Sequence, residues 1–140
     1  MTADYFSNAV FINDGKMNFT AHALPWNAQF TSYKDAVVVN ANNDNLPDIL
    51  MVGNYYENNI EMGRYDADFG TLLVNQGNGK FTCELVDGLK IKGQSRHIKK
   101  LKIADKEAYI VARNNDSAVV IQFSGNVEKR NPKGKEKKKP

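Results

Sequence analysis

Residues 35–53 read DAVVVNANNDNLPDILMVG, two short apolar runs with a polar loop between them. The runs, Ala36–Val39 and Ile49–Val52, are rich in β-branched residues and apolar at nearly every position. Such runs predict β-strands that are covered on both faces, although periodicity alone leaves a buried helix segment as the alternative. We expect the rest of the chain to be organised around these two strands.

The nine-residue loop between the runs, residues 40–48, carries oxygen-bearing side chains at its first, third, fifth and ninth positions. These side chains belong to Asn40, Asn42, Asp44 and Asp48. Calcium takes about six to eight oxygen ligands, and alternate residues of a tight loop can direct such atoms at one centre. At the sixth position, Asn45 is the best substitute for glycine where the backbone φ is positive. The spacing predicts a calcium loop with the Leu46 carbonyl as a fifth ligand. The alternative is an ordinary turn, since turns also favour Asn and Asp.

The stretch NANNDNLPDIL in this loop resembles the Asp-x-Asn-x-Asp-Gly-x-x-Asp-Leu loop of FG-GAP/VCBS repeats, the blades of integrin-α-like β-propellers. Residues 53–59 and 68–70, GNYYENN and DFG, resemble large VCBS-repeat surface proteins of Bacteroidetes-type bacteria. The resemblance covers about residues 9–123. It implies four-stranded antiparallel blades, a calcium site and export to the bacterial cell surface or periplasm. Asn40 and Asn45 stand where the family usually has Asp and Gly, so the implied calcium binding is weak.

A hairpin pattern occurs twice in the chain, at residues 9–24 and again 62 residues later. The matching identities are Asn13 with Asn75, Gly15 with Gly77, Phe19 with Phe81 and Thr20 with Thr82. A repeat of this length, made of short strands, predicts an all-β fold of propeller-type blades. We expect part of one blade at 9–24, a full blade at 36–86 and part of another at 97–123.

About two blades form an incomplete ring, since propellers usually have about four to eight. We therefore expect the chain to be a C-terminal fragment of a longer protein. Its open edges, at residues 9–13 and 118–123, would pair with other blades of that parent chain or with a second copy.

The longest irregular segment, residues 54–69, is rich in residues that recognition surfaces use. Its candidate ligand-binding or partner-binding residues are Tyr55, Tyr56, Glu57, Arg64, Tyr65, Asp66 and Asp68. The segment predicts a surface for a protein or glycan ligand; the alternative is a structural lid over the blade edge. In the connection at residues 25–34, we expect Trp26, Phe30 and Tyr33 to pack between blades, with an aromatic ligand platform as the alternative.

The 140 residues carry a net charge of +3, but the charge is unevenly distributed. Residues 124–140 hold seven Lys or Arg and two Glu, so this tail carries +5 and residues 1–123 carry about −2. The composition of the tail predicts disorder. Cys83 is the only cysteine, which excludes an intrachain disulfide. No apolar stretch approaches the roughly 20 residues that a membrane span needs.

The sequence nominates no catalytic residue. His22 and His97 lie in separate strand patterns without a Cys/His cluster, which argues against zinc, and no serine has the context of a nucleophile elbow. We therefore predict a non-catalytic, calcium-binding module of an exported surface protein. The alternatives are part of a propeller-type enzyme that acts on polysaccharide through an active site on missing blades, and a basic-tailed nucleic-acid binder.

Overall fold

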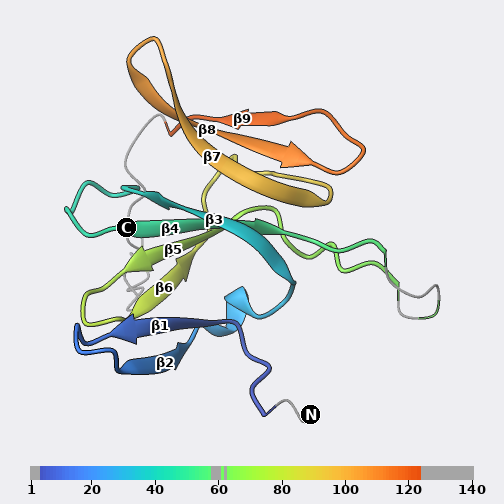
Figure 1. The fold of residues 1–140 in the computed structure, drawn as a ribbon. Helices are drawn as coiled ribbons and strands as arrows, with labels where there is room; N and C mark the ends of the chain where they lie inside the picture. Colours follow the sequence, from blue (N-terminus) through green and yellow to red (C-terminus); the bar gives the residue numbers. More distant parts are fainter. Residues whose placement is uncertain (1–3, 58–60, 62, 124–140) are drawn as a thin grey trace, which may run out of the picture.

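The computed structural model describes residues 4–57, 61 and 63–123, and in these ranges the protein is all-β, as predicted. Its strands form three antiparallel sheets (Figure 1). The sheets comprise β1 (Ala9–Asn13) and β2 (Phe19–Ala23); β3 (Tyr33–Val39), β4 (Asp48–Gly53), β5 (Thr71–Asn75) and β6 (Phe81–Glu84); and β7 (Ser95–Ile103), β8 (Lys106–Arg113) and β9 (Val119–Ile121). One 3₁₀ turn, η1 (Trp26–Ala28), follows β2. The described sheets do not close into a barrel or a propeller, and these ranges contain no helix with the length and apolarity to cross a membrane.

The two apolar runs become β3 and β4, the first two strands of the four-stranded sheet. β4 pairs with β3 along one edge and with β5 along the other. Alternate residues of β4 serve opposite faces of the sheet, as the pleat requires. Leu50 and Val52 pack with Ile98 of β7, whereas Met51 packs with Ala28 of η1. Both faces are therefore covered, which explains why this strand is apolar at nearly every position.

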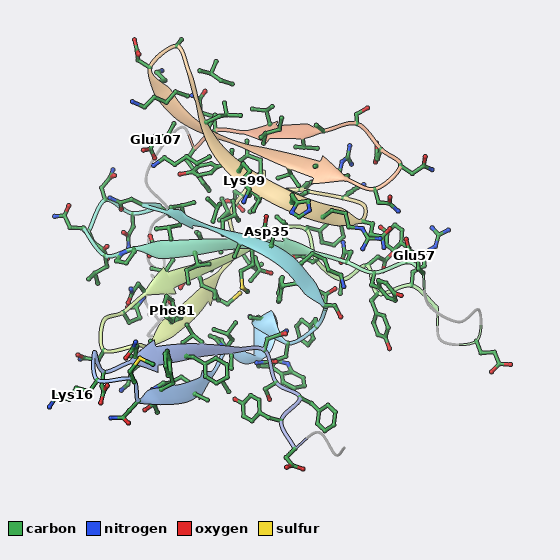
Figure 2. The ribbon with its side chains drawn as sticks, viewed as in Figure 1. Lys16, Asp35, Glu57, Phe81, Lys99 and Glu107 are labelled. Atoms are coloured by element: carbon green, nitrogen blue, oxygen red, sulfur yellow. The ribbon has the colours of Figure 1, made fainter. Side chains whose placement is uncertain are left out.

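The sheets lie one above another, with β3–β6 between β1–β2 and β7–β9 (Figure 1). Asp35 of β3 joins the middle sheet to the third: its carboxylate accepts the Ile98 N–H at 3.0 Å and lies 3.4 Å from His97 Nδ1 and 3.9 Å from Lys99 Nζ (Figure 2). Burial acts to raise the pKa of this carboxyl, but the N–H groups of Ile98 and Ala36 together with Lys99 outweigh it and lower the pKa. A charged residue thus fixes how β3 and β7 lie side by side.

The aromatic connection differs from the prediction. Trp26 is 75% exposed and Phe30 is 48% exposed, and their rings meet edge-to-face at 5.3 Å. The prediction that Trp26 packs between sheets was wrong, because η1 directs Ala28 into the interior instead. Tyr33 does pack against the core between the first two sheets, and its hydroxyl shares a 2.8 Å hydrogen bond with Thr71 Oγ1. Burial raises the pKa of Tyr33 to about 12.

Candidate functional site

The predicted calcium loop connects β3 to β4 and is held in shape by its own polar groups. Asn45 has a φ of 63°, so the prediction of a left-handed residue at the sixth position is confirmed; Asn43 also has a positive φ, of 56°. The Asn42 and Asp44 side chains lie side by side, with Asn42 Nδ2 donating to Asp44 Oδ2 at 2.9 Å. Asp44 Oδ1 accepts the Leu46 N–H at 2.9 Å. These bonds compensate for the strain of the left-handed residues.

Asp48, the ninth residue of the loop, is completely buried. One carboxylate oxygen accepts the Ala41 N–H at 3.0 Å, and the other accepts the N–H of Asn75, at the end of β5, at 2.8 Å. The Asn75 side chain donates a hydrogen bond of 3.0 Å from its Nδ2 to the Pro47 carbonyl. Asp48 therefore fixes both ends of the loop and joins them to β5, a structural role that the metal prediction did not include.

The donor set of the loop fits a hard cation in its chemistry. Its side chains include two carboxylates, Asp44 and Asp48, and the amide groups of Asn40 and Asn42. Each oxygen of Asp48 holds one backbone N–H and has a second lone pair for another partner. Asn42 presents its Nδ2 to Asp44, so its amide must turn to offer oxygen to a cation. In the described ranges, this loop included, no three or more His, Cys, Asp or Glu side chains gather in a group that could hold a metal ion.

The base of the 54–69 segment is a buried network between Asn54 and Asp68. The Asn54 side chain donates to the carbonyls of Asp68 and Gly93, at 2.8 and 3.0 Å, and accepts the Asp68 N–H at 3.0 Å. Asp68 is only 5% exposed, and its carboxylate accepts from the Gly53 N–H and the Thr71 hydroxyl. Asp68, proposed from the sequence as a ligand-binding residue, thus lies in the interior and anchors the segment.

The outer part of the segment has the remaining predicted residues at or near the surface. Residues 58–60 and 62 lie outside the described part of the chain. Tyr55 and Tyr65 exchange two backbone hydrogen bonds of 2.9 Å, which pair the two arms of the segment. Lys34 Nζ lies 4.9 Å from the Tyr55 ring centroid, and the Arg64 guanidinium lies 5.1 Å from that of Tyr56. Two neighbouring tyrosines, Tyr55 and Tyr56, therefore each form a cation–π pair.

Charged and amide groups attach this segment to the third sheet. Glu57 accepts from Arg96 of β7 at 2.8 Å and from the Asn114 side chain at 3.5 Å (Figure 2). Gln94, with its amide oxygen turned toward Arg96, also accepts the Tyr56 N–H at 3.2 Å. Glu57 thus links the segment to Arg96 and Asn114, although it lies at the surface. Asp66 is exposed. Sequence reasoning missed Arg96, Gln94 and Asn114, because they belong to strands and turns far along the chain.

The first prediction concerns Asp48. In Asp48→Asn, one of the two buried N–H groups faces an amide NH₂ in place of an oxygen. We expect a loss of about 1–3 kcal/mol in the free energy of unfolding, measured by urea denaturation in calcium-free buffer. The exposed carboxylate of Asp66 provides the control, and Asp66→Asn should change stability by less than about 0.5 kcal/mol. Equal stability of the two variants without calcium would contradict the structural role of Asp48.

The second prediction concerns Asp68. Burial raises the pKa of its carboxyl above the ordinary 3.8, against the opposing effect of hydrogen bonds from Thr71, Gly70 and Gly53. A raised pKa means that the folded state binds the proton more tightly, so this contribution to stability is full below the unfolded pKa and is lost as pH rises through the folded pKa. The stability of the wild type minus that of Asp68→Asn should therefore decrease from about pH 4 to about pH 7. A difference that is constant across this range contradicts the prediction.

Comparisons of the chain with models of protein families, with curated proteins and with solved structures find no match. The resemblance to FG-GAP/VCBS repeats therefore rests on the residues of the loop and the following segment alone. Membership of that family stays a prediction.

Proposed function

We propose that this chain is a non-catalytic, calcium-binding, β-propeller-type module that binds a protein or glycan ligand as part of an exported bacterial surface protein. The observation that carries the proposal is the loop between β3 and β4. Its oxygen-bearing side chains recur at calcium-loop spacing, and Asn45 has the left-handed backbone that this spacing requires. The resemblance to VCBS-repeat proteins is the support for a bacterial surface location.

Calcium would be held by oxygens from five loop residues. The proposed ligands are the side chains of Asn40, Asn42, Asp44 and Asp48 and the backbone carbonyl of Leu46. The ion would screen the two carboxylates from each other and cross-link the loop. Because Asn40 supplies an amide rather than a carboxylate, the attraction is weaker than in a loop with three acids. We therefore place the dissociation constant at about 10⁻⁴–10⁻³ M, as in extracellular modules.

The ligand surface would be the outer part of the 54–69 segment. Tyr and Arg dominate the energetic centres of binding surfaces, since they combine large contact area with directed polar groups. Tyr56 and Arg64 are already stacked, so their positions are partly ordered before a ligand arrives. The buried Asn54–Asp68 network supports them from below without using the surface. Within this proposal, other blades of a parent chain or a second copy would cover the open sheet edges.

Calcium titration tests the metal part of the proposal. We expect calorimetry to give a dissociation constant of about 10⁻⁴–10⁻³ M for the wild type and a lower one for Asn40→Asp, because a third carboxylate adds attraction. At ten times the dissociation constant, calcium should stabilise the fold by about 1.4 kcal/mol. Asp105→Asn, in the short turn between β7 and β8, is the matched control and should leave the affinity unchanged. Unchanged affinity in Asn40→Asp would mean that the loop is only a turn.

A glycan microarray, followed by a panel of purified surface proteins, tests the ligand part. Binding should decrease by at least about tenfold when Tyr55, Tyr56 and Arg64 are all replaced by alanine, because the contact surface of two half-buried rings and an exposed guanidinium is lost. Trp26→Ala provides the control, since Trp26 is an exposed aromatic residue on η1. If the triple variant binds like the wild type while Trp26→Ala does not, the connection before β3 is the ligand surface instead.

A further inference from the structure

The first and second sheets contain the same hairpin. β1 pairs with β2 in the register of β5 with β6, each pair displaced by 62 residues: Val10 opposite His22 corresponds to Leu72 opposite Glu84. Both hairpins close with the same turn, in which the Oδ1 of Asn13 or Asn75 accepts an N–H two residues on at 2.8 Å. The strand that pairs with the β5–β6 hairpin therefore indicates which kind of strand the β1–β2 hairpin can bind.

The surroundings differ at one edge. β5 pairs with β4, and beyond the last pair Asp48 Oδ1 accepts the Asn75 N–H at 2.8 Å while Asn75 Nδ2 donates to the Pro47 carbonyl at 3.0 Å. Among the residues that the structure describes, β1 pairs only with β2. The bond from Leu24 N to Asn8 O fixes the alternation, so every second residue of β1 directs its N–H and C=O away from β2. Those residues are Ala9, Phe11 and Asn13.

The side chains show the same contrast in exposure. Phe11 is 63% exposed, whereas its equivalent in β5, Leu73, is 1% exposed. Ile12 is 38% exposed, whereas Val74 is completely buried. An open strand edge with apolar side chains is a template for pairing with another strand. Figure 1 places the β1–β2 hairpin at the end of the stack opposite β7–β9, with β1 nearer to the four-stranded sheet than β2.

We propose that the free edge of β1 binds an extended segment with the chemistry of residues 47–53, a Pro-Asp pair followed by an apolar run. Its carboxylate would accept the Asn13 N–H, and the proline carbonyl would accept from the Asn13 side chain, as Asp48 and Pro47 do at Asn75. The occupant is a strand of another polypeptide segment. It is not β4 of a second copy, because β4 is paired on both edges inside its own sheet. This surface lies on a different sheet from the predicted calcium loop and the 54–69 segment, so its test is separate from theirs. The inference rests on the proposed function, in which open sheet edges are covered, and names the chemistry of the strand that covers this one.

The test uses the 140-residue chain and a synthetic peptide with the sequence LPDILMVG, residues 46–53. We expect saturable binding by fluorescence anisotropy, with amide exchange at Phe11 and Asn13 slowed by at least about tenfold. Replacing the peptide's aspartate with alanine should weaken binding by about tenfold or more, because a charge-assisted hydrogen bond to Asn13 is lost. This arm uses the unchanged chain, so it does not depend on the folding of any variant.

Two chain variants locate the site. Phe11→Lys should weaken peptide binding by about tenfold or more, since it replaces apolar cover with a charge at the edge. Val120→Lys, at an exposed position in β9 at the other end of the stack, should bind the peptide like the wild type. Protection at β9, equal binding of the alanine peptide, or no binding would overturn the proposal. A wild-type dimer that dissociates in Phe11→Lys but not on addition of the peptide would also overturn it, because the edge would then bind a second copy of the chain.

Discussion

The structure depends on the burial of β4 from all four sides. β3 and β5 satisfy its backbone groups along both edges, and core residues of the neighbouring sheets cover both faces. Complete burial of Leu50 and Val52 removes their apolar surface from water, which drives folding, and strand pairing on both edges provides hydrogen-bond partners for backbone groups in the buried strand. The two segments proposed to carry function are attached at its ends. The predicted calcium loop enters β4 at Asp48, and the 54–69 segment leaves it at Gly53.

The repeat explains how those segments can vary while the strands stay constant. β3 and β7 carry an irregularity at the same place, between Tyr33 and Asp35 and between Ser95 and His97, 62 residues apart. Between β7 and β8, however, the loop is reduced to a tight turn in which Ala104 and Asp105 both have positive φ. The strands set the spacing of the sheets, whereas the connections can be exchanged at the strand ends without disturbing the core.

Local sequence patterns predicted the central strands and the loop backbone, because both depend on neighbouring residues. The apolar runs required cover on both faces, and Asn45 required a left-handed backbone. The roles of the buried carboxylates were not predictable in the same way. The Asp68 carboxylate accepts hydrogen bonds from the Gly53 N–H and the Thr71 hydroxyl, and the Asp48 carboxylate accepts one from the Asn75 N–H. Neither role therefore follows from spacing within the segment that carries the carboxylate. The prediction for Trp26 was wrong because the 3₁₀ turn η1 buries the small Ala28 and leaves Trp26 exposed.

The position of Asp48 has a consequence for how the chain resists proteases. A long polar loop between strands is ordinarily a favoured site of nicking, because a protease must draw an extended stretch of substrate into its own active site. Here one buried carboxylate holds Ala41 at the start of the loop and Asn75 of the adjacent strand. Drawing the loop outward would break both bonds and expose that carboxylate together with the end of β5. Cleavage of this loop is therefore coupled to opening of the central sheet, and its rate follows the stability of the sheet rather than the exposure of the loop.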